Sequence, residues 1–453
     1  MKKPDIDSRM LENFSWPLLF SLLGLMGAGL VNLYSFTGGR GIVEWNLFSR
    51  HCFFVLTGFV VASASLFFDY RILKKWAWPL FILGFALLIL VKYKGVVVNG
   101  SNRWLPLGPF GRFQPSEPVK VFAVIFLAYL LSIKEYKQGL DFKDLLLPLG
   151  LLLVPIYLIL KQPDMGTAIH ILVTAGPILL YAKLRPRVLI TFLLLIVVVP
   201  TWLFTFGGLN FLLEHKVIRP YHIQRYEIFK NPERDPNGRG WQITQSKSAI
   251  GSGQVTGRGF MEGSQQKYGF LPAAETDFAF AALAEEWGFV GSVMVLLIYL
   301  ALLWSAFAVV KKSGDKFGAL IAVGVVSMLF TQIAINVAMV SGLFPVVGIP
   351  LPLISYGGSS TLTTFLGLGL LVNIGMRRYL FQDDPVVQNP KVWEAEPVAL
   401  SAQTVVAASG VSLLESGRPH DKPWLKHLIK KRNWAHMFGP DRALSSPKKS
   451  PFF

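Results

Sequence analysis

The stretch FAFAALAEEWGFVGSVMVLLIYLALLWSAFAVV, residues 278–310, decides the class of fold. Glu285 and Glu286 are its only charged residues, and about 20 apolar residues are enough to cross the hydrocarbon core of a bilayer. The sequence therefore predicts an all-α polytopic integral membrane protein with about ten transmembrane helices. These are expected at about residues 15–36, 48–68, 76–92, 116–133, 144–160, 166–183, 188–207, 278–310, 317–340 and 359–376.

The composition of the 453-residue chain agrees with this class, because 52% of the residues are hydrophobic and only 16% are charged. Soluble domains carry roughly 25% charged residues, so this chain lacks the polar surface that it would need in water. A soluble enzyme and a disordered protein are therefore excluded. The single cysteine also excludes a scaffold held by internal disulfides.

The chain is basic, with 44 Lys and Arg against 27 Asp and Glu and a net charge of +17. Cytoplasmic loops of membrane proteins are enriched in Lys and Arg. With the N-terminus inside, the short inner segments hold 17 basic residues and the short outer loops hold 5. We therefore predict that both termini are cytoplasmic. The positive charge then reflects orientation and contact with membrane lipids, and it gives no reason to expect a nucleic-acid partner.

This orientation divides the chain into a cytoplasmic N-terminus (1–14), a transmembrane domain (15–378) and a cytoplasmic tail (379–453). Residues 208–277 form a large extracytoplasmic loop between the seventh and eighth helices, and a loop this long is often functional. The tail is expected to be partly disordered. Its basic amphipathic segment at 422–437 either lies on the anionic inner leaflet or belongs to a solvated tail.

Polar residues gather at the predicted outer ends of helices, first in the stretches 99–108 and 113–120. Glu117 and Lys120 are three residues apart and share one helix face. They form either an ion pair that fixes helix packing or part of a polar cavity open to the outside. Arg103 adds positive charge that suits an anionic ligand such as a phosphate.

Two further clusters belong to outer turns. In the turn 161–167, Asp164 either caps the next helix or contributes to a site. The segment 342–360 contains three prolines and four glycines among apolar residues, and it cannot form a regular helix. Irregular backbone at membrane depth is tolerated only when it is buried in protein or lines a cavity. We therefore expect a re-entrant or tightly folded outer segment.

The long loop 208–277 combines basic residues with glycines, as in the stretch 249–254. Glycine allows a backbone to approach a ligand closely, and arginine binds phosphate oxygens with two parallel hydrogen bonds. The loop therefore suits a phosphate ligand. Its basic residues include Arg219, Arg225, Lys230, Lys247, Arg258 and Lys267.

Asp277 lies at the end of this loop, at the start of a predicted span. Either it caps the helix, as Thr276 could, or its carboxylate accepts a proton from an incoming hydroxyl group. The low dielectric nearby and the neighbouring Glu275 are both expected to raise the pKa of Asp277.

Together the four clusters resemble the SEDS family (shape, elongation, division and sporulation) of bacterial cell-wall synthesis. The resemblance covers about residues 10–380, and the segment 345–358 looks more like the elongation member RodA than the division member FtsW. The chain departs from the family pattern in 270–277, where Ala273 and Glu275 replace the usual Glu and His. The matching stretches are 99–104, 114–117 with Lys120, 162–167, 219–225, 240–242, 249–253, 276–278, 285–288 and 345–360.

The resemblance implies a peptidoglycan glycosyltransferase that polymerises lipid II, as donor and acceptor, on the outer face of the bacterial cytoplasmic (inner) membrane. It further implies a class B penicillin-binding protein and other elongation-complex membrane proteins as partners. By motif, Asp277 matches the essential aspartate of the family, and Glu117, Lys120 and Asp164 match polar positions that line its central cavity. Arg103, Lys120, Arg219 and Arg225 are the candidates to hold the diphosphates. The residues expected to bind substrate are Arg103, Gln114, Glu117, Lys120, Asp164, Arg219, Arg225 and Ser355.

The resemblance also leaves room for a divalent cation, Mg or Mn, although the sequence shows no dedicated ligands. A lipid II flippase, a division-type polymerase and a non-catalytic scaffold for the penicillin-binding protein are the alternatives. A flippase should need polar groups on both faces of its path, whereas these clusters gather on the outer side.

Overall fold

The structure is a computed structural model that describes residues 12–37, 42–98, 101–106, 108, 111–134, 136, 138–205, 220–236 and 238–377. The first eleven residues and the predicted tail, with its basic segment at 422–437, lie outside the described residues. Arg219 also lies outside them.

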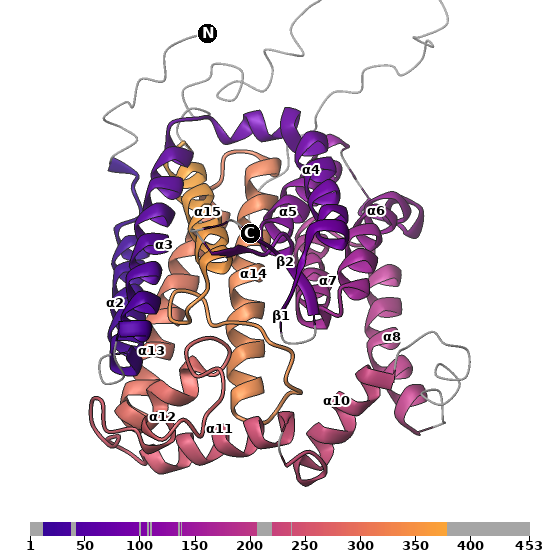
Figure 1. The fold of residues 1–453 in the computed structure, drawn as a ribbon. Helices are drawn as coiled ribbons and strands as arrows, with labels where there is room; N and C mark the ends of the chain where they lie inside the picture. Colours follow the sequence, from indigo (N-terminus) through magenta and orange to yellow (C-terminus); the bar gives the residue numbers. More distant parts are fainter. Residues whose placement is uncertain are drawn as a thin grey trace, which may run out of the picture. The chain divides into compact units, whose positions relative to one another are not determined.

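The described residues form a helical bundle, which confirms the predicted class of all-α polytopic membrane protein (Figure 1). Eight of their helices are long and apolar enough to cross a membrane. The apolar helices α7 (Met165–Tyr181) and α8 (Pro186–Thr205) bring the number to the predicted ten. The eight longer ones are α2 (Trp16–Thr37), α3 (Ile42–Leu66), α4 (Leu73–Lys94), α5 (Ser116–Ile133), α6 (Phe142–Lys161), α13 (Ala279–Lys312), α14 (Lys316–Val340) and α15 (Gly358–Met376).

Helices α5, α14 and α15 occupy the centre of the bundle. Buried residues make up 67%, 72% and 83% of their apolar windows, against 17% and 22% for α3 and α4. Glycine allows the central helices to approach closely, because a Cβ on Gly324 of α14 would collide with Val124 of α5. The peripheral helices expose aliphatic side chains such as Leu194 and Val197, as expected of residues that face lipid.

The predicted span 278–310 is broken within α13. Gly288 has φ +63° and ψ −161°, which is not helical, and a Cβ there would collide with the amide nitrogen of Gly257. The amides of Phe289 and Val290 bond to carbonyls of residues 254 and 255 (N···O 2.9 and 3.1 Å). The backbone groups freed by the break are therefore satisfied by the loop that precedes α13.

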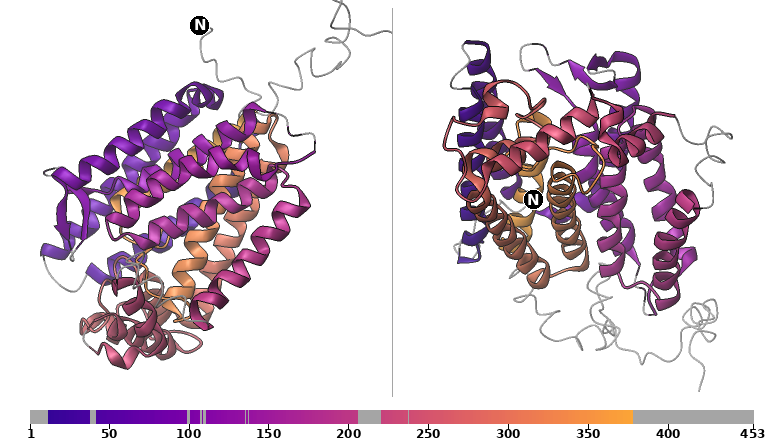
Figure 2. Two further views of the ribbon diagram at one scale, coloured as in Figure 1. Left: turned by 90° about the vertical axis from the view of Figure 1, so that its right-hand side faces the viewer. Right: turned by 90° about the horizontal axis from the view of Figure 1, so that it is seen from below.

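The predicted extracytoplasmic loop 208–277 is largely helical where it is described. It contains α10 (Pro220–Lys230), a 3₁₀ turn (Pro232–Arg234), α11 (Arg239–Gly253) and the single turn α12 (Ser264–Lys267). These helices gather at one end of the bundle, at the bottom of Figure 1 and across the front of the right-hand view in Figure 2. The glycine content of this stretch hides its helices from sequence reasoning.

The segment between α4 and α5 forms a small antiparallel sheet that the sequence analysis does not predict. Its strands are β1 (Val96–Val98), β2 (Ser101–Pro106) and β3 (Arg112–Phe113), in the order β1-β2-β3. Val97 pairs with Asn102, and Leu105 pairs with Phe113. We call the end of the bundle that carries this sheet, α10–α12 and residues 341–357 the loop end, and the opposite end the far end.

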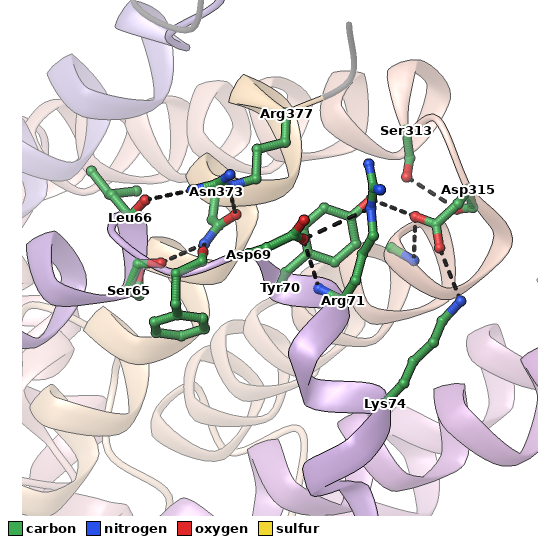
Figure 3. Close-up of polar contacts among 12 residues, drawn as sticks. Ser65, Leu66, Asp69, Tyr70, Arg71, Lys74, Ser313, Asp315, Asn373 and Arg377 are labelled. Atoms are coloured by element: carbon green, nitrogen blue, oxygen red, sulfur yellow. Dashed lines mark hydrogen bonds and ion pairs between the residues drawn. The ribbon is translucent and has the colours of Figure 1, made fainter. Parts of the chain in front are cut away.

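At the far end a compact set of polar contacts joins α3, α4, α14 and α15 (Figure 3). Asp315 caps α14 by accepting the amide of Gly318 (3.3 Å), binds the hydroxyl of Tyr70 and lies 3.6 Å from Nζ of Lys74. Asn373 donates to the carbonyls of Ser65 and Phe68, the latter at 2.7 Å. These contacts join helix ends that are far apart in the sequence.

Candidate active site

Asp164 is the centre of the polar contacts at the loop end. It is the N-cap of α7, accepting from the amide and the hydroxyl of Thr167 (3.2 and 2.9 Å), and its side chain is buried. The same carboxylate also accepts from Gln114 Nε2 (3.1 Å) and Ser116 Oγ (3.3 Å). The interpretation of Asp164 as a helix cap is therefore confirmed, and its role in a substrate site stays a prediction.

Arg103 reaches Asp164 from strand β2. Its Nη1 lies 3.5 Å from Asp164 Oδ1, its Nε donates to the carbonyl of Gln162 (3.2 Å), and its Nη2 donates to that of Pro163. The side chain keeps 16% of its surface exposed. The hairpin of β1 and β2 thus holds a guanidinium group over the turn between α6 and α7, with part of it accessible to a ligand.

The irregular segment 342–357 is held by α14, and the start of α15, which follows it, is held by Gln114. The backbone amide of Gln114 donates to Ser359 Oγ at 2.9 Å. On α14, Gln332 donates to the carbonyl of Pro350 (2.9 Å), and Asn336 donates to that of Ile349 (2.7 Å). The segment is largely buried and without regular secondary structure, which agrees with the expected tightly folded outer segment.

Asn336 also joins this segment to Asp277, because its Nδ2 donates to the backbone carbonyl of Asp277 at 2.9 Å. Sequence reasoning missed Asn336 and Gln332. The available signal was two amide side chains four residues apart within an apolar helix, where a polar side chain is expensive unless it is bonded.

Asp277 lies immediately before the N-cap of α13, which is Phe278, so the prediction that Thr276 or Asp277 caps this helix is wrong. Gly348 packs against the Asp277 carboxylate, since a Cβ on this glycine would lie 3.3 Å from Asp277 Oδ2. Gly348 has φ +74°, a left-handed conformation that glycine adopts without strain. The site therefore uses a glycine to bring irregular backbone close to a carboxylate.

The Asp277 side chain keeps part of its surface exposed, yet the surrounding protein removes enough water to raise its pKa to about 6. The positive charges of Arg103 and Arg225 oppose this rise, and the negative charges of Glu275 and Asp164 add to it. The upward shift predicted from the sequence has the expected direction and the expected cause. A carboxyl group with this pKa accepts a proton effectively near neutral pH.

Arg225 comes from α10 and is 8% exposed, and its charge acts on Asp277 across the site. Three predicted substrate-binding residues therefore act on Asp277 through their charges, and a fourth bonds to one of them: these are Arg103, Asp164 and Arg225, with Gln114 bonded to Asp164. They originate from β2, the start of α5, the start of α7 and the long loop.

Glu117 and Lys120 behave differently, because they form a buried ion pair with Nζ 2.9 Å from Oε2. Their side chains are 5% and 4% exposed, and the void beside Lys120 measures only about 10 Å³. A void of this size is at the lower limit for one water molecule. Both residues belong to α5, so the ion pair lies within one helix. Their part in a polar cavity open to the outside stays a prediction.

Ser355 is also occupied, because its buried hydroxyl oxygen accepts the amide of Leu351 at 2.8 Å. It stabilises a turn of the irregular segment. The predicted contact of Ser355 with substrate stays a prediction.

Two glycines of the long loop, Gly253 and Gly257, pack closely against α13. A Cβ on Gly253 would collide with the carbonyl of Ala284, and one on Gly257 with that of Glu286. Their task is close packing of the loop against α13. Glu285 of α13 also stabilises this packing. It accepts a hydrogen bond from Ser264 Oγ (2.9 Å) and lies 3.8 Å from Arg258 Nε, and both partners belong to the loop.

The described residues contain no group of three or more Asp, Glu, His or Cys side chains arranged to hold a metal ion. Asp164 is already bonded to Thr167, Gln114 and Ser116 and paired with Arg103. The residues present thus do not fit a protein-held divalent cation, and no catalytic step is assigned to one.

A family model described as "Cell cycle protein", covering FtsW, RodA and SpoVE, matches residues 16–380. The chain belongs to this SEDS family. It is a SEDS peptidoglycan glycosyltransferase and a multi-pass membrane protein.

Relatives within the SEDS family carry both member names. Peptidoglycan glycosyltransferase RodA of Treponema pallidum is 32% identical over 435 residues, covering 82% of this chain and 99% of the relative. Probable peptidoglycan glycosyltransferase FtsW of Trichlorobacter lovleyi is 33% identical over 370 residues, covering 80% and 93%. The chain is thus about equally similar to a relative named RodA and to one named FtsW.

Solved structures of SEDS proteins share the fold. A chain from a peptidoglycan synthase complex that coordinates polymerization and crosslinking matches with a TM-score of 0.68 and 30% identity, over 81% of this chain and 98% of that one. The rod shape determining protein RodA of Thermus thermophilus matches with a TM-score of 0.58 and 28% identity, over the same shares.

Proposed function

We propose that this chain polymerises lipid II into glycan strands on the outer face of the bacterial cytoplasmic membrane during cell elongation. One observation carries the proposal: the partly exposed Asp277 carboxyl, with a pKa of about 6, lies within the electrostatic reach of Arg103 and Arg225. A proton acceptor beside two cations suits a reaction in which a hydroxyl is deprotonated and a diphosphate departs.

In the proposed reaction, the 4-hydroxyl of one lipid II attacks the anomeric carbon of a second one. Asp277 accepts the hydroxyl proton while the bond between that carbon and the diphosphate oxygen breaks. The diphosphate leaves on its polyprenyl carrier, and Arg103 and Arg225 stabilise its growing charge. Asp164 and Gln114 position Arg103, and the Glu117–Lys120 pair supports the helices below.

The orientation follows from the charge distribution, since 17 basic residues in the short inner segments against 5 in the short outer loops support cytoplasmic termini. The division into an N-terminus (1–14), a transmembrane domain (15–378) and a cytoplasmic tail (379–453) belongs to the same proposal. A class B penicillin-binding protein is the proposed partner, supported by the structural neighbour that couples polymerization to crosslinking. The RodA-like segment 345–358 supports a role in elongation.

The test is a lipid II polymerisation assay with the full-length protein and its penicillin-binding partner. General-base catalysis contributes about 10²–10⁴-fold, so we expect Asp277→Asn to lower the rate by about 1,000-fold. The melting temperature of this variant should stay unchanged. Glu262→Gln is the matched control, because it removes a 65% exposed carboxylate from the same loop and should keep the wild-type rate.

Glycan synthesis by Asp277→Asn at the wild-type rate would contradict the assignment. Translocation of labelled lipid II across vesicles without polymer would instead support the flippase.

A further inference from the structure

Three large aromatic side chains are exposed next to one another on the long loop. Trp241, Tyr268 and Phe270 are 38%, 67% and 46% exposed. The ring centres of Tyr268 and Phe270 are 5.8 Å apart, and the indole N–H of Trp241 donates to the backbone carbonyl of Phe270 at 3.1 Å. We call these three residues the aromatic platform. A single exposed apolar side chain is ordinary, whereas a cluster of them marks a surface that is used for binding.

The backbone holds the aromatic platform in place. The amide of Tyr268 donates to the carbonyl of Ser264 (3.1 Å), and the amide of Phe270 donates to that of Gln265 (2.9 Å). Leu271, the next residue, is 4% exposed and belongs to the hydrophobic core. The two rings are therefore presented from a fixed turn, so little conformational entropy is lost when a ligand binds to them.

The platform lies near the centre of the loop end, because α11 carries Trp241 across this end of the bundle (Figure 2, right). On the same helix, Ser246 Oγ donates to the carbonyl of Val340 at 2.7 Å, and Val340 is the last residue of the central helix α14. Trp241 and Ser246 are five residues apart, which corresponds to about 8 Å along the axis of α11. The platform is thus close to the end of the central helix rather than at the perimeter that faces lipid.

The indole of Trp241 also differs from an aromatic anchor in the lipid headgroups. Interfacial Trp and Tyr side chains place an apolar ring toward the acyl chains and a polar group toward water. In the platform the polar group of the indole is bonded to the backbone of Phe270. A ligand that reaches Trp241 therefore meets the apolar ring.

The chain leads directly from the platform to the candidate active site. Phe270 precedes Asp277 by seven residues, which limits the distance between their Cα atoms to about 25 Å. A turn shortens this path, since the amides of Thr276 and Phe278 both donate to the carbonyl of Ala273 (3.1 and 3.2 Å). The platform therefore adjoins the carboxylate that is proposed as the base.

A sugar ring has a face of C–H groups that packs on an aromatic ring, while its hydroxyl groups stay in contact with water. We propose that the aromatic platform binds sugar rings of the growing glycan strand, several sugars away from the end that carries the diphosphate. This inference rests on the proposed function, because its ligand is the product of that reaction. No bond forms or breaks at the platform. It holds the strand between successive additions, so it lengthens the product.

The test compares strand length with the rate of the first coupling, in a lipid II assay on the full-length protein and its penicillin-binding partner. Tyr268→Leu with Phe270→Leu keeps an apolar surface but removes two planar rings. An aromatic contact changes affinity by about fivefold, so strands should be released sooner and their median length should fall about fivefold. The rate of the first coupling should fall much less, because two lipid II molecules do not extend to the platform.

The matched control is Tyr93→Leu with Phe289→Leu, which removes two rings that are 75% and 67% exposed outside the platform. It should make strands of wild-type length. Equal strand lengths from the platform and control variants would overturn the proposal. Shortening in liposomes alone, with wild-type length in detergent, would also overturn it and identify the membrane surface as the occupant.

A binding measurement separates this proposal from the proposed function. The probes are soluble, lipid-free oligosaccharides released from glycan strands, and saturation-transfer NMR detects which of their C–H groups contact the protein. We expect a signal with the wild type and its loss in the platform variant at an unchanged melting temperature. An equal signal from both proteins would overturn the proposal. Absence of polymer from the wild type in the lipid II assay would instead contradict the proposed function.

Discussion

The loop end and the far end of the bundle use polar side chains in opposite ways. At the far end Asp315 is satisfied by Tyr70, Lys74 and the helix that it caps, and Asn373 closes the end of α3 (Figure 3). At the loop end, amide side chains bind irregular backbone, while Asp277 keeps part of its surface exposed.

This difference shows that irregular backbone needs hydrogen-bond donors from other elements and that it can approach a side chain closely. At the far end, caps and side-chain contacts such as those of Asn373 satisfy the carbonyls that the helix ends leave open. Residues 342–357 make no regular ladder, so their carbonyls need donors from α14. In return, this backbone lies against a carboxylate that a regular helix could not approach so closely.

The largest expected effect distinguishes two asparagine variants, one at each end of the bundle. Asn336 and Asn373 are both buried, and each donates to two backbone carbonyls. Either change to alanine leaves buried carbonyls unsatisfied and should cost about 3 kcal/mol of stability. We expect only Asn336→Ala to lower the polymerisation rate per folded molecule, by about 100-fold, because it releases Asp277.

Denaturation curves and the lipid II assay on both purified variants check this expectation. Equal loss of rate in the two variants would mean that stability alone explains the effect.

The next effect is on the pH profile of the wild-type enzyme. A general base works only when it is ionised, and the pKa of Asp277 is raised from 3.8 to about 6. The rate should therefore rise as the pH increases through about 6 and level off above about 7. At pH 5 it should be about a tenth of the plateau, because about a tenth of the carboxyl groups are then ionised. A flat profile between pH 5 and 7 would argue against Asp277 as the base.

The smallest effect concerns the glycine over the carboxylate. Gly348→Ala forces a side chain into a left-handed conformation, at about 1 kcal/mol, and places its Cβ against Asp277 Oδ2. Gly269→Ala carries the same strain (φ +70°) with open space around its Cβ. We expect both variants to lose similar stability and only Gly348→Ala to lose rate, by about fivefold. Equal rates in the two would show that the loop does not position Asp277.

Much of the candidate site was predictable because it depends on local chemistry. Asp164 precedes an apolar helix, and Asp277 ends a polar loop beside a span, so both stood out as carboxylates at the membrane boundary. The upward pKa shift of Asp277 also followed from its position next to a low-dielectric region.

Other features were not predictable, because they depend on partners far along the chain. Gly253 and Gly257 lie against the carbonyls of Ala284 and Glu286 in α13. Likewise, the break of α13 at Gly288 is satisfied by backbone bonds to residues 254, 255, 258 and 259 of the preceding loop.

The amino-acid sequence alone was enough to predict the membrane class, about ten spans and the clustering of polar residues at one end of the bundle. The reason is that a bilayer forces each span to satisfy its own backbone, so apolar length and flanking charge are local signals. The tertiary structure was needed to show that the charges of Arg103, Asp164 and Arg225 act on Asp277. Those residues belong to separate elements, and only the packing of the helices that carry them brings their charges together.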